Sequence, residues 1–185
     1  MDAIEAIHKR QSIKRFSSQP VELDKIAQLL DAGAQAPNHY KGRPWRFVVL
    51  EGAARERLGD VMADVLKRRF PELPPEGLRK ERAKPLRSPV IIAVGVDEPG
   101  EPKVLEIENI CAAAAACENI LVAAVAIGLG GHWRTGDAAR DPDIKRFLGF
   151  SEKQPLIAFL YIGYPELEPP VPVRPDYEDR TRWLE

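Results

Sequence analysis

The stretch VLEIENICAAAAACENILVAAVAI, residues 104–127, decides the fold. Its residues are apolar nearly all round a helix, and such a helix must be enclosed on most sides. Glu108, Glu118 and Asn119 interrupt it, so no charge-free run reaches the roughly 18 to 20 residues that a membrane span needs. We therefore expect a core helix. A chain of 185 residues has little material to enclose it, which leads us to infer a partner subunit.

Two cysteines, Cys111 and Cys117, lie in this stretch. At about 100° per residue they point to different faces of the helix and cannot pair with each other. No CxxC motif or nearby histidine supports a metal or redox role. We expect both to be buried packing residues, and we expect no metal site.

Shorter elements flank the long helix. Apolar residues at helical spacing predict helices over 3–10, 22–34 and 53–68, and a short helix begins at Asp141-Pro142 and ends before Gly149. Apolar and β-branched runs predict strands over 45–50, 89–96 and 156–164, and a short extended segment over 131–135. Residues 38–44 form a loop, and the proline-rich stretches 71–89 and 165–175 connect or wrap. The order predicts a mixed α+β fold, with one domain over 1–185.

Composition and charge narrow the class of partner. Lys+Arg of 27 against Asp+Glu of 28 gives a formal net charge of −1, so no overall field attracts nucleic acid or an anionic membrane. We expect small-molecule partners. The opening MDAIEAIHKRQSIKRF lacks the uninterrupted apolar stretch of a secretory signal, so the expected location is cytoplasmic. The basic stretch 79–87 is typical of a solvated helix or loop, with contact to a nucleotide phosphate as the alternative.

Several catalytic motifs are absent from the sequence. It contains no G-x-S-x-G nucleophile elbow, no HExxH and no G-x-x-x-x-G-K-[ST] phosphate loop, which removes the main support for a hydrolase or a kinase. Gly128, Gly130 and Gly131 resemble a dinucleotide fingerprint in composition, but they follow a helix and do not join a strand to a helix. We expect no Rossmann-type site.

A polar cluster, KRQSIKR at 9–15, stands where the first helix gives way to an extended segment. Charge runs of this kind are usually solvated. In an extended segment, however, Arg10, Ser12 and Lys14 project to one side. A guanidinium suits phosphate oxygens and an ammonium suits a point of negative charge, so this row is a candidate for binding a phosphate and a polarised ring.

Three motifs carry a resemblance to a known family. They are RQSIKRF at 10–16, APN at 36–38 followed by RPWRF at 43–47, and GLGGHWRTG at 128–136. In this order and spacing the chain resembles the flavin-dependent nitroreductase family along nearly its whole length. The resemblance implies a nitroreductase-like α+β sandwich, a mainly antiparallel sheet flanked by helices with a long central helix. It also implies an intimate homodimer, in which the tail 165–185 wraps on the partner.

The resemblance assigns FMN contacts to the first motif. Arg10 would bind the FMN phosphate, Ser12 the phosphate or ribityl region, and Lys14 the N1/O2 edge of the ring, where negative charge collects on reduction. Gln11 stands where the family has a second arginine, and its polarity is expected to preserve FMN binding.

Further contacts are implied by the other two motifs. Gln35 and His39 would reach the flavin bound mainly by the other subunit. Gly130 and Gly131 would offer backbone N–H groups near N5 and O4, and the phosphate and ribityl side would be completed by His132, Trp133 and Arg134. Without the resemblance, the default for these histidines is an ordinary surface or half-buried position, and for Trp133, as for Trp45, core packing.

Two more positions depart from the family pattern, Asn38 for serine and Arg43 for glutamine. Asn38 is polar, as serine is, so this change is expected to preserve FMN binding. Arg43 adds a cation near the flavin mouth, and two alternatives stay open: contact with an anionic acceptor, or pairing with a surface glutamate.

The implied activity is an FMN-dependent NAD(P)H oxidoreductase that works by a ping-pong mechanism on nitroaromatic, quinone or similar conjugated acceptors. FMN performs the chemistry, so no catalytic protein residue is expected, and NADH or NADPH is the transient hydride donor. The alternatives are a flavin reductase, an enone reductase, or a flavin-binding module without turnover.

Overall fold

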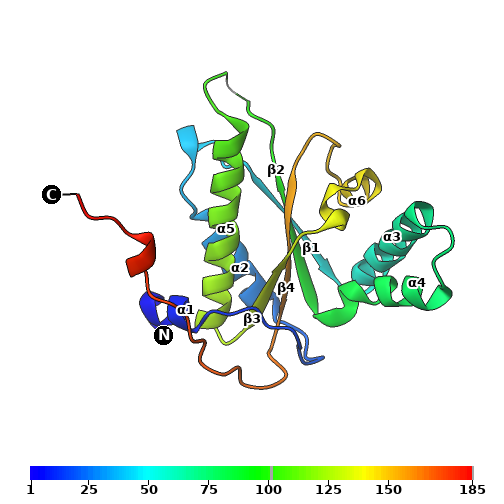
Figure 1. The fold of residues 1–185 in the computed structure, drawn as a ribbon, viewed down its shortest axis with the longest axis horizontal. Coiled ribbons are helices and arrows are strands. Elements are labelled where there is room, and N and C mark those ends of the chain that lie inside the picture. The colour runs from blue at the N-terminus through cyan, green and yellow to red at the C-terminus, as the bar shows by residue number, and fades with distance from the viewer. Residues whose placement is uncertain (101, 185) are drawn as a thin grey trace.

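The computed structural model describes residues 1–100 and 102–184. Its helices, shown in Figure 1, are α1 (Ala3–Lys9), α2 (Leu23–Ala34), α3 (Ala53–Arg69), α4 (Pro75–Arg82), α5 (Glu106–Ala126) and α6 (Pro142–Phe147). Its strands are β1 (Trp45–Glu51), β2 (Val90–Val96), β3 (Gly130–Arg134) and β4 (Leu156–Gly163). Every helix and strand expected from the sequence is present within two residues at either end, so the mixed α+β interpretation is confirmed.

The four strands form one antiparallel sheet in the order β1-β2-β4-β3. Helices α5 and α2 cover one face of it, and α3, α4 and α6 lie on the other side (Figure 1). The central strand β2 is buried along its whole length, as its continuous apolar run predicts for a strand covered on both faces. Ile92 and Val94 join the core under α5, and Ile91 and Ala93 join the core under α3.

Helix α5 is the long central helix that the sequence predicts. Ala113, Ala116 and Ile120 are fully buried against the sheet and α2. Among the described helices α5 meets the length and apolarity of a membrane span, but these core contacts assign its buried face to the sheet. The prediction for Cys117 is confirmed, whereas that for Cys111 is wrong in the single chain, because Cys111 lies on the uncovered side of α5.

The proline-rich stretch 71–89 contains more structure than a connection. It holds α4 and a 3-10 turn, Lys84–Arg87, which places most of the basic stretch on a helix. Gly59 of α3 permits the close approach of α4, because a Cβ at this position would lie 2.2 Å from the Arg82 carbonyl oxygen. Helix α4 is therefore packed against α3.

The tail from residue 165 to residue 184 is largely extended, as its prolines predict, with one 3-10 turn at Glu178–Arg180. It returns to the N-terminal end of the chain, where α1 and the tail lie side by side (Figure 1). The sequence predicts no such contact. It is made by Gln11, whose amide donates to the Pro170 carbonyl at 2.5 Å, and by Arg174.

Candidate functional site

The N-terminal segment runs beside the edge strand β3. Ser12 forms an isolated bridge to Gly131, and the Ile13 N–H donates to the Gly131 carbonyl at 2.9 Å. Ile13 is buried, so its neighbours Ser12 and Lys14 are turned outward and exposed. The common direction expected for alternate residues of this segment is therefore present for Ser12 and Lys14.

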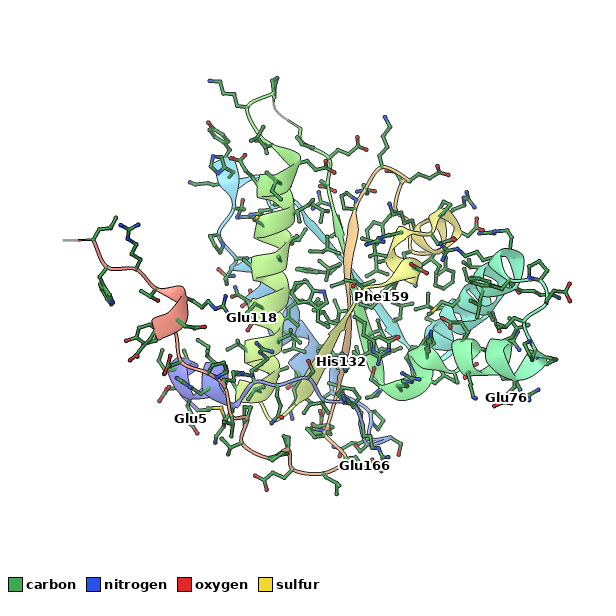
Figure 2. The ribbon with its side chains drawn as sticks, in the orientation of Figure 1. Glu5, Glu76, Glu118, His132, Phe159 and Glu166 are labelled. Carbon is green, nitrogen blue, oxygen red and sulfur yellow. The ribbon has the colours of Figure 1, made fainter. Side chains whose placement is uncertain are left out.

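Arg10 stands at the C-terminal end of α1, half-buried. Its Nε lies 3.3 Å from Glu118 Oε1 of α5, within ion-pair range (Figure 2 labels Glu118 on α5). That nitrogen is buried, and the approach of Glu118 is not aligned as a hydrogen bond, so Nε has no hydrogen-bond acceptor among the described residues. A buried guanidinium N–H without an acceptor is costly, and an anionic ligand would relieve the cost.

Arg174 joins Arg10 from the far end of the sequence. Its guanidinium donates to the carbonyl oxygens of Ile7 and His8 at 3.4 Å each, and to that of Arg10. Helix carbonyls at a C-terminus carry partial negative charge, which explains the attraction of a cation. Arg174 could not be singled out from the sequence, because an arginine in a proline-rich tail carries no signal of a contact 164 residues away.

The alternation of β3 divides the third motif between two faces of the sheet. His132 and Arg134 face α3 and α4, and Gly131 and Trp133 face the core under α5. Trp133 packs against that core and donates from Nε1 to the Ile157 carbonyl at 3.0 Å. The default of core packing thus holds for Trp133, and its flavin contact stays a prediction.

Glycine is required at 130 and 131 by close packing. A Cβ on Gly130 would lie 2.5 Å from Ile13 Cγ1, and one on Gly131 would lie 2.3 Å from Leu121 Cδ2. The first contact places the N-terminal segment close against β3, and the second places α5 close against it. The predicted contact of the two N–H groups with a flavin remains a prediction.

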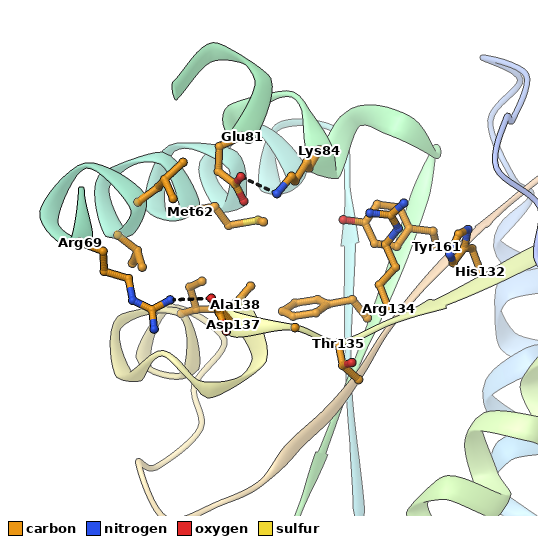
Figure 3. Close-up of a pocket in the computed structure, with 15 residues that line it drawn as sticks. Met62, Arg69, Glu81, Lys84, His132, Arg134, Thr135, Asp137, Ala138 and Tyr161 are labelled. Atoms are coloured by element: carbon orange, nitrogen blue, oxygen red, sulfur yellow. Dashed lines mark ion pairs between the residues drawn. The ribbon is translucent and has the colours of Figure 1, made fainter. Parts of the chain in front are cut away.

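A hollow of about 430 Å³ opens on the face that carries His132 and Arg134 (Figure 3). Its apolar floor comes from α3, α6 and β4 and includes Met62, Val65, Ile144 and Phe159. Its polar wall consists of His132, Arg134, Thr135, Gly136, Tyr161 and two ion pairs, Lys84–Glu81 at 2.5 Å and Arg69–Asp137 at 3.2 Å. A hollow in which an apolar floor meets convergent polar and charged groups is a candidate small-molecule site.

Positive charge converges on His132. Burial lowers the pKa of His132, and the charges of Arg134, Lys14 and Arg87 lower it further, against the opposite effect of its hydrogen bond to the Ile13 carbonyl. The Arg134 guanidinium also lies 5.7 Å from the centre of the Tyr161 ring. Such a site favours a ligand with negative charge.

Arg87, like Arg174, was missed in the sequence analysis. The 3-10 turn after α4 brings it to His132, and the solvated interpretation of the basic stretch gave no reason to single it out.

Gln35 and His39 are not brought to this site within one chain. Gln35 Nε2 donates to Asp31 Oδ1 at 3.3 Å, and His39 Nε2 lies 3.7 Å from Glu108 Oε1 near the start of α5. Glu118, the partner of Arg10, is ten residues further along that helix, or about 15 Å. The expected contact of Gln35 and His39 with the flavin of a second subunit stays a prediction. Among the described residues, no three His, Cys, Asp or Glu side chains gather to hold a metal ion.

Comparison with known proteins connects this geometry to a family. The model of the family described as "Nitroreductase family" matches residues 7–164. The Escherichia coli (strain K12) protein named "Putative NAD(P)H nitroreductase YdjA" is 33% identical over 168 residues, which span 91% of each chain.

Solved structures agree on the fold. The nitroreductase-like family protein from Bacillus cereus is 24% identical, with a TM-score of 0.83 over 100% of this chain and 97% of that one. A mutant of the "FMN and NADPH-dependent nitroreductase NfnB" from sphigopyxis sp. strain HMH is 17% identical, with a TM-score of 0.78 over 99% of each chain.

Proposed function

This chain belongs to the nitroreductase family, and on that premise we propose that it is an FMN-dependent NAD(P)H oxidoreductase that reduces nitroaromatic, quinone or similar conjugated acceptors. The observation that carries the proposal is the positive charge of Arg134, Lys14 and Arg87 around His132, at a hollow that His132 and Arg134 line. A flat ring that gains negative charge on reduction suits such a site.

The residues present fit FMN. Arg10 offers a buried N–H without an acceptor among the described residues, Arg174 stands beside it, and Ser12 is exposed nearby, which suits a phosphate. At the hollow, Gly136 has a φ of +85° and open space where a Cβ would stand, so a ring edge can approach the backbone. The volume of about 430 Å³ lies within the range of small-molecule sites.

The chemistry that FMN supplies when bound is hydride transfer from NAD(P)H and then to the acceptor, in two half-reactions of a ping-pong scheme. In the proposal, Lys14, Arg87 and Arg134 stabilise negative charge at the hollow, so Arg134 serves the ring and not the phosphate and ribityl side that the resemblance implies. His132 is held neutral there because its pKa is lowered, first by burial. His132 Nδ1–H donates a hydrogen bond to the Ile13 carbonyl at 3.1 Å, which leaves Nε2 of the neutral ring as an acceptor. No protein nucleophile is needed.

We also propose that the chain, a single domain over 1–185, works as a homodimer in which the tail crosses to the partner. Apolar side chains stand exposed on α1, on the uncovered side of α5 and on the tail, among them Ile4, Ile107 and Trp183. Burial of such surface is the main driving force for association. Light scattering on purified protein tests this, and a monomer that still binds FMN tightly would contradict it.

The absorbance spectrum of the purified protein, followed by anaerobic addition of NADPH or NADH, tests the proposed function. We expect oxidised-flavin bands that bleach with one or both donors and return when an acceptor is added. Bound FMN that neither donor bleaches would favour the flavin-binding module without turnover. A colourless protein that takes up no added FMN would remove the proposal.

A further inference from the structure

The loop between α2 and β1 is held in an unusual backbone conformation. Three residues that are not glycine have positive φ: Tyr40 at +49°, Lys41 at +57° and Arg43 at +48°. Side chains with a Cβ rarely adopt this region, because it costs of the order of 1 kcal/mol or more per residue. Such strain persists only where the surrounding structure fixes the chain, and it is concentrated at ligand clamps and active sites.

Asn38 and Arg46 fix the two ends of this loop. Asn38 Oδ1 accepts the Arg43 N–H at 2.9 Å, and Asn38 Nδ2 donates to the Ala36 carbonyl at 3.1 Å. Arg46 Nη1 donates to the Arg43 carbonyl at 3.1 Å, and Arg46 itself is tied to Asp97 by an ion pair. The conformation is therefore built by neighbouring side chains.

The strained loop presents two cations to solvent. Lys41 and Arg43 are exposed, and among the described residues neither forms an ion pair. Arg46, three residues further on, forms an ion pair with Asp97. Of the two alternatives for Arg43, pairing with a surface glutamate thus finds no support in the described part of the chain. What remains is a cation held outward on a strained backbone.

The loop also borders an apolar hollow of about 430 Å³ on the uncovered side of α5. Its lining includes Pro37, Ile107, Ala112 and Ala115, and His39 from the loop and Glu108, which lie 3.7 Å apart, also line it. An apolar surface beside two cations is complementary to a flat molecule that carries an anionic group.

We propose that Lys41 and Arg43 bind a negatively charged oxygen group, a carboxylate or a phosphate, on a substrate of the enzyme. The inference rests on the proposed function, because it is the expected approach of His39 to the flavin of the second subunit that brings this loop to the reaction. Two substrates can supply the group: the acceptor through a carboxylate, or the nicotinamide dinucleotide through its phosphates.

The test compares the wild-type holoenzyme with Arg43→Asn and with Lys41→Asn/Arg43→Asn. Asparagine removes the charge and tolerates positive φ, so the loop keeps its conformation. Arg43→Lys keeps a charge, and Arg57→Gln on the exposed surface of α3 is the matched control. Thermal melting and FMN content verify that each variant is folded and loaded.

Kinetics are measured with 4-nitrobenzoate and with neutral 4-nitrobenzamide, each with NADH and NADPH. In Arg43→Asn we expect the KM for one anionic substrate to rise about tenfold, which corresponds to the loss of one charge-assisted hydrogen bond. The rise should be larger in the double variant. Arg43→Lys should recover part of it. A rise confined to nitrobenzoate assigns the group to the acceptor. A rise in the KM of the dinucleotide with both acceptors assigns it to the phosphates.

Changes below twofold for every substrate would overturn the inference while the proposed function stands, because wild-type turnover of the neutral acceptor establishes that function independently. If the wild-type protein oxidises neither NADH nor NADPH with any acceptor, the proposed function fails and the inference falls with it. A change of the same size in Arg57→Gln would show a general effect of surface charge and would also overturn it.

Discussion

Replacement of Arg10 by alanine separates the role of this side chain in binding FMN from its role in the fold. The ion pair with Glu118 joins side chains that are 32% and 46% exposed, so its loss costs the fold at most about 1 kcal/mol. Glu118 is left solvated, and no buried charge is created. A charge-assisted hydrogen bond to phosphate contributes about 1.5 to 3 kcal/mol, which corresponds to FMN binding roughly 10-fold to 150-fold weaker.

The assay is a titration of apoprotein followed by quenching of flavin fluorescence, with FMN and with riboflavin, which lacks the phosphate. We expect Arg10→Ala to weaken FMN strongly and riboflavin by less than threefold. Arg15→Ala is the matched control, since Arg15 is an exposed arginine of the same segment. If Arg10→Ala binds FMN as the wild type does, or loses both ligands by the same factor, the assignment of the phosphate to Arg10 is refuted.

Three further predictions concern the scaffold of the site. Gly59→Ala should destabilise the protein by about 1 to 3 kcal/mol in urea unfolding, because its Cβ would meet the backbone of Arg82 at 2.2 Å, and an unchanged midpoint would contradict the packing of α4. Hydrogen bonding and charge from Arg68 lower the pKa of Asp143, so the stability that Asp143 adds is present above its ordinary pKa of 3.8 and is lost as the pH falls. In Asp143→Asn, the midpoint of urea unfolding should therefore fall less between pH 7 and pH 3 than it does in the wild type. An equal fall in the two proteins would argue against this role of Asp143. Burial raises the pKa of Cys117 to about 12, so its thiol should react with a disulfide reagent at pH 8 only after unfolding, and rapid labelling of Cys117 in the native Cys111→Ala variant would disprove its burial.

The fold could be predicted from the sequence because its signals are local and consistent. The apolar run at 90–96 and the long apolar helix each allow one interpretation, and both are confirmed. Helix α4 was the harder case, since prolines around it favour a connection. It is stabilised by tertiary contact, and Gly59 on another helix makes room for it. A sequence pattern within 71–89 does not contain that information.

The site shows the same division between local and distant information. The outward direction of Ser12 and Lys14 follows from strand geometry alone, and the structure has it. The same alternation places His132 and Arg134 on one face of the sheet and Gly131 and Trp133 on the other. The resemblance treats the motif as one block and does not predict this division.

Arg87 and Arg174 lay beyond sequence reasoning for a different reason. One reaches the site through the turn after α4, and the other through the fold-back of the tail. Both contacts join parts of the chain that are far apart in sequence, and an exposed arginine looks the same whether or not such a contact forms. Only the folded chain distinguishes them.

The position of β3 at the sheet edge explains why the site lies where it does. β4 pairs with one side of β3, and on the other side the bridge between Ser12 and Gly131 covers only its beginning. Beyond Gly131, no strand of the described chain pairs with this edge, so the N–H and C=O of Trp133 remain available there, whereas those of His132 and Arg134 point to β4. Edge strands are usually covered or charged, and this one carries Arg134 and leads into Gly136 with its open approach. His132, Arg134, Thr135 and Gly136 also line the hollow, so a flat ligand bound there would lie beside the end of β3 that the N-terminal segment leaves uncovered, which is the physical reason to expect the site at this edge of the sheet.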